Sequence, residues 1–339
     1  MKHYGKLTAA AAAGFMALSA MGVAPVFAAE TDTGFEVDVK KTVTKNDTSA
    51  LVPNVTFNYT ITNGDASGAI KAGINGGLVA KNNDLALETN DDAVGKSTTT
   101  YTGITLEAPN SAYTSAGPGV YHYVVNETAH ATDDYDGFTG TTTSINVYVF
   151  VEQDPATKAN TVTSISATSD GETKTDVDFA ANYDTYTLAV TKEVTGNMGD
   201  KDRDFTFTGG VTASGAHDRF TANKGTAVAT TITDKSTIST NLKHGETYTL
   251  HGLSAKDAAN LAENDYTSDS YTTIIKKDDA VVESAAKTAS DANNLAYTVT
   301  NNKQVTTPTG ILMTAAPYAG LVALGGIFAG LFFRRKRED

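Results

Sequence analysis

Along most of the chain, apolar and polar residues alternate in short runs separated by clusters of Gly, Asn and Asp. Residues 35–43 and 188–194 alternate in this way, and turn-like clusters stand at residues 63–65 and 75–77. Alternation with a period of two is typical of strands that bury one face. The pattern therefore predicts an all-β protein built from β-sandwiches. Residues 255–264, rich in Lys, Asp and Ala, are the one plausible helix between the two ends of the chain.

Two lysines fall on the apolar face of these predicted strands. In residues 35–43 the inward set includes Lys41, and in residues 188–194 it includes Lys192. Successive side chains of a strand point to opposite faces, so both amines should enter the core. An unpaired buried ammonium costs several kcal/mol, so each lysine needs a partner or must lose its charge.

Candidate partners occur in the same phase further along the chain. Glu127 continues the face of Tyr121 and Tyr123, and Asn301 continues the face of Tyr297 and Val299. Each half of the chain contains a lysine, a glutamate and an asparagine in the same order. The two sets are Lys41, Glu127 and Asn182, and Lys192, Glu263 and Asn301.

The N-terminal residues have the pattern of a secretory signal peptide. Lysines near the start precede an apolar run over residues 7–23, and small residues follow it. Val26 and Ala28 suit the −3 and −1 positions for cleavage after Ala28. Cleavage after Ala29 would place Phe27 at −3 and is the poorer fit. We therefore expect the chain to be exported.

The C-terminal residues form a different signal. Residues 311–333 carry no charge and are long enough to cross a bilayer, and the basic tail 334–339 predicts a cytoplasmic end. The chain before them reads Thr306-Thr307-Pro308-Thr309-Gly310. This order resembles the cell-wall sorting signal of Gram-positive bacteria, in an x-x-P-T-G variant rather than L-P-x-T-G. The resemblance implies that a pilin-type sortase cleaves between Thr309 and Gly310 and passes the Thr309 carbonyl to an amine.

Composition narrows the possible partners. The 339 residues include no cysteine, so no disulfide braces this exported chain. Removing residues 1–28 and 310–339 takes away 6 of the 26 basic and 2 of the 39 acidic residues, which leaves 20 against 37 and a net charge of −17. Such a surface argues against nucleic acid or anionic lipid as a partner.

These motifs together resemble the two-domain backbone pilins of streptococcal type. The matching segments are residues 37–41, 50–54, 119–127, 188–196 and 298–303. The resemblance implies two tandem Ig-like (CnaB-like) β-sandwich domains, each closed by a spontaneous Lys–Asn isopeptide bond. The implied organisation is a signal peptide (1–28), an N-terminal domain (29–184), a C-terminal domain (185–305) and a sorting signal (306–339).

Burial gives the chemistry of such a bond. A desolvated lysine has a lowered pKa and can act as a neutral nucleophile, while a buried glutamate has a raised pKa and can carry protons. We therefore expect cross-links between Lys41 and Asn182, with Glu127 as proton shuttle, and between Lys192 and Asn301, with Glu263 in that role.

Two residues depart from the family pattern. Asn182 lies one residue out of phase with Val177 and Phe179, so a β-bulge is needed to turn it inward. Glu263 follows sequence that is poor in strand formers, which leaves a surface glutamate on a short helix as the alternative.

The resemblance also implies a function. The chain is expected to be a pilus shaft subunit joined head to tail to identical subunits, from Thr309 to an acceptor amine. The acceptor is expected to be Lys174, with Lys158 as the nearest competitor. The finished pilus would be attached to cell-wall peptidoglycan, directly or through a basal pilin. A monomeric wall-anchored adhesin or an accessory pilin is the alternative, and any host ligand stays unidentified.

Other features give no sign of an enzyme. The six histidines lack metal-ligand spacing, and residues 133–137 lack the full EF-hand pattern. The chain has no phosphate-binding loop and no Ser or Cys nucleophile constellation. We expect no metal and no cofactor.

Overall fold

The computed structural model describes residues 34–305, apart from 82, 90–91, 129–136, 140–141, 169–173 and 216. The predicted signal peptide and the predicted sorting signal, with Thr309 and Gly310, lie outside these residues. Within the described part of the chain, no helix has the length and apolar character needed to cross a membrane.

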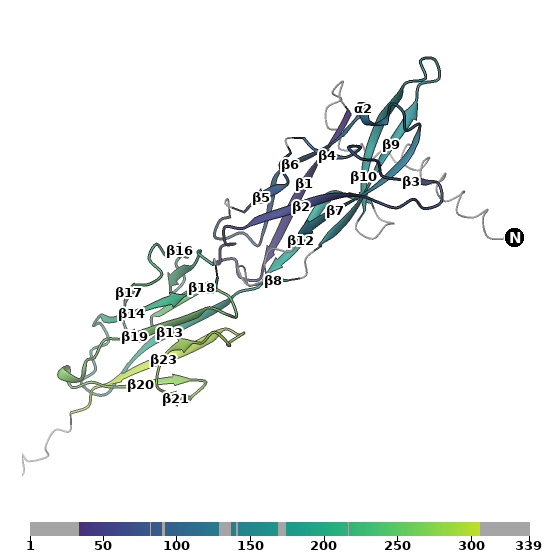
Figure 1. The fold of residues 1–339 in the computed structure, drawn as a ribbon. Helices are drawn as coiled ribbons and strands as arrows, with labels where there is room; N and C mark the ends of the chain where they lie inside the picture. The colour runs from purple at the N-terminus through teal and green to yellow at the C-terminus, as the bar shows by residue number, and fades with distance from the viewer. Residues whose placement is uncertain are drawn as a thin grey trace, which may run out of the picture.

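Two β-sandwiches lie end to end (Figure 1). We refer to residues 34–183, drawn in purple to teal, as the N-terminal domain and to residues 186–302, drawn in green to yellow, as the C-terminal domain. One sheet of the N-terminal domain has the order β4 (Val79–Ala80), β6 (Thr98–Pro109), β1 (Gly34–Lys45), β12 (Val177–Tyr183) and β8 (Phe138–Thr139). The other has the order β11 (Lys174–Thr175), β10 (Asn160–Thr168), β9 (Ser144–Gln153), β7 (Gly119–Thr128), β2 (Thr56–Asn63) and β5 (Ala86–Glu88), with β3 (Ile70–Ala72) beside β7.

The C-terminal domain repeats this plan with fewer residues. Its larger sheet has the order β16 (Thr230–Thr231), β15 (Thr221–Lys224), β18 (Thr247–Leu253), β13 (Tyr186–Thr195), β23 (Leu295–Asn302), β20 (Thr272–Lys277) and β21 (Ala280–Val282). The smaller sheet has the order β17 (Ile238–Leu242), β14 (Phe205–Thr212), β19 (Ala258–Glu263) and β22 (Ala286–Lys287). Among the described residues the helices are the single turns α2 (Asn110–Tyr113) and η1 (Thr267–Asp269). The predicted all-β fold is thus confirmed.

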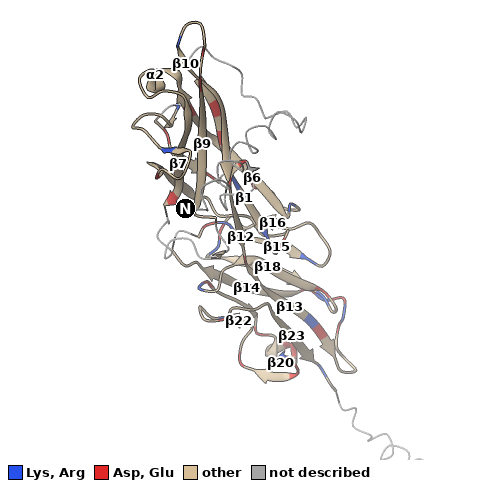
Figure 2. Cartoon of the chain, turned by 90° about the vertical axis from the view of Figure 1, so that its right-hand side faces the viewer, with Lys and Arg blue, Asp and Glu red and all other residues tan. Residues whose placement is uncertain are grey.

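Each domain has its own core between its two sheets. In the N-terminal domain, Val39 and Ile104 of one sheet pack in one buried cluster with Tyr123 and Val147 of the other. A separate cluster that begins at Leu188 fills the C-terminal domain. Charged residues of both signs are spread along both domains (Figure 2).

In both domains the first strand pairs in parallel with the last. Lys41 of β1 lies opposite Phe179 of β12, and Lys192 of β13 lies opposite Val299 of β23. Two parallel strands cannot be joined by a short turn, and here the rest of the domain forms the connection between them. The pairing therefore brings the two ends of each domain together. A bond between these strands would therefore join the beginning of a domain to its end.

The helix expected over residues 255–264 is wrong. Residues 258–263 form β19, which pairs with β14 on one side and β22 on the other. Ala259 and Leu261 are buried and Asn260 is exposed, which is the alternation of a strand. Backbone pairing on both edges thus outweighs the weak strand preference of this sequence.

Two histidines lie at the contact between the domains. His251 Nδ1 of β18 lies 2.7 Å from Asp47 Oδ2 of the N-terminal domain. His217 Nε2 lies 2.9 Å from the Tyr183 hydroxyl at the end of β12, and His217 Nδ1 lies 2.6 Å from Asp257 Oδ2. Tyr183, His217 and Asp257 are all buried, so this chain of contacts is shielded from water.

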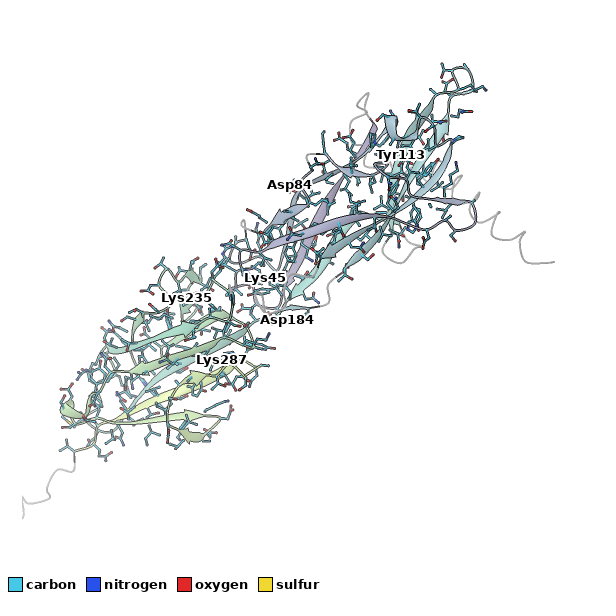
Figure 3. All side chains as sticks on the ribbon, in the orientation of Figure 1. Lys45, Asp84, Tyr113, Asp184, Lys235 and Lys287 are labelled. Atoms are coloured by element: carbon cyan, nitrogen blue, oxygen red, sulfur yellow. The ribbon has the colours of Figure 1, made fainter. Side chains whose placement is uncertain are left out.

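Arg219 adds further contacts between the domains. Its guanidinium donates to the backbone oxygens of Val52 and Asp92, at 3.2 and 3.3 Å. The Asp92 carboxylate in turn forms a buried ion pair of 2.8 Å with Lys45. Lys45 and Asp184 mark this junction in Figure 3. The two domains are therefore joined by directed polar contacts as well as by the chain.

The Asp257 carboxyl should make this junction sensitive to acid. Burial, the largest influence, would raise its pKa, but the His217 contact and the amide groups of Ser214 and Ser254 outweigh burial and lower the pKa. A lowered carboxyl pKa contributes stability above the unfolded value of 3.8 that is lost as the pH falls through the folded pKa. We expect the free energy of unfolding to fall below about pH 4, and to fall less steeply in Asp257→Asn.

Urea unfolding at a series of pH values from about 7 to about 2 would measure this slope. Parallel pH profiles for the native chain and Asp257→Asn would contradict a role for this carboxylate.

Candidate functional site

Lys192 is completely buried near the middle of the C-terminal domain. Its exposed fraction is 0%, and its Nζ lies 2.9 Å from Glu263 Oε1 and 3.2 Å from the Val299 carbonyl oxygen. The amine also lies 4.5 Å from the centre of the Phe205 ring. The prediction that this lysine points into the core is confirmed, and the structure brings it to the expected glutamate.

Asn301 lies next to this pair. It is two residues beyond Val299 on β23, so its side chain points to the same face, and its exposed fraction is 0%. The Thr273 hydroxyl of β20 donates to Asn301 Oδ1 at 2.8 Å. Within the described residues, Asn301 Nδ2 and both Glu263 oxygens lack a hydrogen bond of good geometry, although Lys192 is close. Buried polar atoms without directed partners are uncommon, and a reactive role is one of the explanations for them.

Burial changes the acidity of both ionisable groups. Loss of solvent is the largest influence on Lys192 and lowers its pKa, although Glu263 acts in the opposite sense. Loss of solvent likewise raises the pKa of Glu263 against the influence of Lys192. Both shifts favour transfer of a proton from the amine to the carboxylate. The pair can thus supply an uncharged amine beside a carboxylic acid.

The N-terminal domain contains the same pair. Lys41 has an exposed fraction of 0%, and its Nζ lies 2.9 and 2.8 Å from the two Glu127 oxygens. The amine lies 4.4 Å from the centre of the Phe57 ring. Burial again lowers the pKa of the lysine and raises that of the glutamate.

The two sites are built by equivalent strands. Glu127 of β7 lies opposite Tyr59 of β2, and Glu263 of β19 lies opposite Phe207 of β14. The ring that lies against each lysine amine belongs to a phenylalanine two residues earlier on the same strand. These residues are Phe57 and Phe205.

The prediction for Asn182 needs correction. Asn182 is exposed and lies opposite Thr44 in a pairing of β1 with β12 that continues without a register shift. The expected bulge is absent, so the side chain points away from Lys41. Lys41 lies opposite Phe179, and the next residue of β12 on the same face is Ala181. Ala181 is buried and occupies the position that Asn301 has in the C-terminal domain. The structure therefore gives Lys41 no asparagine at this position.

Of the two candidate acceptor lysines, one lies in a strand of the second sheet of the N-terminal domain and the other in a turn of that sheet. Lys174 is in β11, opposite Thr168 of β10. Lys158 is exposed in the turn between β9 and β10, with a φ of 59°. The acyl donor Thr309 lies outside the described residues.

Three contributors to the sites were not predicted from the sequence. Thr273 contacts Asn301 because their strands are neighbours, and Phe57 and Phe205 cover the lysines because of strand register. Alternation shows that such residues point inward or outward, but it does not show which strand lies opposite.

The chain is similar to known proteins in both sequence and fold. Residues 186–303 match a family described as a domain of unknown function, DUF7601. A pilin of Streptococcus pyogenes serotype M1 is 32% identical over 342 residues, covering 92% of this chain and 95% of that protein. The crystal structure of the major pilin from Streptococcus pyogenes has a TM-score of 0.54 at 24% identity and covers 80% of this chain and 99% of its own. A second major pilin of that species, T3.2, has a TM-score of 0.54 at 22% identity over 80% of this chain and 99% of its own.

The buried ion pair of the N-terminal domain gives a stability test. Lys41→Met leaves Glu127 buried without a counter-ion and should cost about 3–5 kcal/mol of unfolding free energy. Lys41→Met combined with Glu127→Gln removes both charges and should restore most of that loss. Urea unfolding followed by tyrosine fluorescence would measure both variants.

Lys40→Met is a matched control for these variants. Lys40 is the adjacent residue and forms an ion pair of 2.9 Å with Asp176 at the surface, so its loss should cost less than about 1 kcal/mol. Equal destabilisation of the single and double Lys41 variants would show that the charge of Glu127 is not the source of the cost.

Proposed function

The chain belongs to the pilin family, and on that premise we propose that it is the shaft subunit of a covalently assembled surface pilus. We further propose that its C-terminal domain forms an isopeptide bond between Lys192 and Asn301. The observation that carries this proposal is a buried cluster of three groups: the Lys192 amine on the first strand of that domain, the Asn301 carboxamide on the last strand, and the Glu263 carboxyl on β19 of the other sheet. The role is structural, since the reaction occurs once in each molecule.

The bond would form in three steps. Glu263 takes a proton from the Lys192 ammonium, and the neutral Nζ attacks Cγ of Asn301. Negative charge then develops on Asn301 Oδ1, where the Thr273 hydroxyl already donates at 2.8 Å. Glu263 relays a proton from the attacking nitrogen to Nδ2, the bond from Cγ to Nδ2 breaks, and ammonia leaves. The product is a neutral amide, and Glu263 keeps the proton that it took from the Lys192 ammonium, so it ends as an uncharged carboxylic acid.

Such a bond would stabilise a chain that has no cysteine. It closes a loop of about 110 residues, and restricting the unfolded chain in this way contributes about 5 kcal/mol. It also removes two charges from the core and replaces them with one amide, which lowers the cost of burial.

Assembly requires a second amide, between subunits. We propose that a sortase joins Thr309 of one subunit to Lys174 of the next and finally attaches the polymer to peptidoglycan, directly or through a basal pilin. The motif at residues 306–310 and the position of Lys174 close before β12 support this arrangement. A monomeric adhesin or an accessory pilin is the alternative that the assembly experiment below tests.

Mass spectrometry tests the bond within the subunit. Purified residues 29–309 should be lighter than the calculated chain by one ammonia molecule, and a proteolytic fragment should contain Lys192 joined to Asn301. Asn301→Ala and Glu263→Gln should each restore the calculated mass. A folded native chain of unreduced mass would rule the bond out, whereas a loss of two ammonia molecules would show that the N-terminal domain also reacts.

Immunoblotting tests the bond between subunits. Wall extracts boiled in detergent should give a ladder of polymers for the native chain and a single band for Lys174→Ala. Lys158→Ala is the matched control and should leave the ladder intact. A ladder that Lys174→Ala does not alter would exclude this acceptor, and the absence of any ladder in the native strain would favour the monomeric adhesin.

A further inference from the structure

We propose that the N-terminal domain contains an unused amide-forming site, in which the Lys41 amine and the Glu127 carboxyl are in place and position 181 carries no carboxamide. The inference rests on the function proposed for Lys192, because it assumes that the same chemistry operates in the C-terminal domain. The substrate that this site would accept is the side chain of an asparagine placed on β12.

The reacting groups of the two sites match closely. The distances from the amine to the nearest carboxylate oxygen are 2.8 Å in the N-terminal and 2.9 Å in the C-terminal domain. The distances from the amine to the phenylalanine ring beneath it are 4.4 and 4.5 Å. Both lysine side chains are fully buried, and both glutamate side chains are 3% exposed. The nucleophile and its proton carrier are therefore in place in both domains.

The acceptor position also matches, and only its residue differs. Each lysine lies opposite a residue of the last strand in a parallel pairing, and the inward position two residues later is Ala181 in one domain and Asn301 in the other. Ala181 is 3% exposed, so a side chain at this position points into the core, toward the face that holds Lys41. An asparagine here would be presented as Asn301 is presented to Lys192.

A second difference lies beside the glutamate. Tyr59 occupies the position of Phe207, and its hydroxyl is buried without a directed hydrogen bond among the described residues. Burial and then Glu127 raise the pKa of this hydroxyl, so it is close to the carboxylate and stays protonated. The Tyr59 ring lies 4.8 Å from the Phe179 ring on β12. The N-terminal domain thus has a hydroxyl beside Glu127 at a position where the C-terminal domain has the unsubstituted ring of Phe207.

The reaction in Ala181→Asn would be balanced in the same way as at Lys192. Glu127 accepts the proton of Lys41, Nζ forms a bond to Cγ of the new asparagine, and the bond from Cγ to its amide nitrogen breaks. Glu127 relays a proton to that nitrogen, which leaves as ammonia. No oxidant or other reactant is needed.

The experiment is the intact mass of Ala181→Asn in residues 29–309. We expect the loss of one more ammonia molecule than in the native chain, and a fragment that joins Lys41 to position 181. Glu127→Gln in the same background should prevent this second loss. Ala180→Asn is the matched control, because residue 180 is exposed on the opposite face, and it should show no second loss.

A second variant allows for crowding at the site. Tyr59→Phe combined with Ala181→Asn reproduces both residues of the C-terminal site and should react at least as completely as the single variant. If the loss at Lys192 occurs but neither variant loses a second ammonia, the latent site is refuted while the proposed function stands. Failure of both variants to fold would likewise overturn the inference, since the space would not admit a carboxamide. Absence of the loss at Lys192 itself would overturn the proposed function.

Discussion

The structure depends on the burial of one lysine amine in the core of each domain. Each amine lies on the first strand of its domain and faces the last strand, which is its parallel neighbour. Such a position gives an ammonium no access to water, so the surrounding strands must supply a counter-charge. Glu127 and Glu263 do so from the opposite sheet. The lysine thus links the closing pair of strands in one sheet to a central strand of the other.

The two domains differ in how they can offset the cost of burying the charged amine. In the N-terminal domain the amine remains paired with Glu127, and the attraction between the charges offsets only part of the cost of removing both from water. In the C-terminal domain Asn301 offers an acceptor through which the charges can be eliminated. The difference between an ion pair and a covalent bond therefore depends on one side chain of the last strand, Ala181 or Asn301.

The alternation of apolar and polar residues predicted most of this site from the sequence. The remaining residues depend on which strands are neighbours, and the sequence pattern does not specify that. The inward direction of Lys41, Lys192, Glu127 and Asn301 follows from a period of two, and all four are buried. The phase of residues 177–183 also places Asn182 on the outward face, and the structure agrees with the phase. The family spacing, which predicts that Asn182 reaches Lys41, is wrong here. The helix predicted for residues 258–263 is wrong because pairing on both edges, and not intrinsic preference, makes them a strand. Thr273 could not be found, because no local pattern specifies which strand lies beside β23.

In the proposed fibre, the path of tension gives a reason why one isopeptide bond per subunit would suffice. With Lys174 and Thr309 as the proposed points of attachment, the covalent path would follow β12 and β13 as far as Lys192 and would then cross the proposed isopeptide bond to Asn301. β12 is already extended and pairs with a strand on each side, so tension along it releases no folded chain. The strands before Lys174 would lie outside this path, so an ion pair would be adequate there. An acceptor at Lys158 would instead place β10 and β11 in the path. These two strands are antiparallel, so the path would double back, and their pairing would have to resist the load.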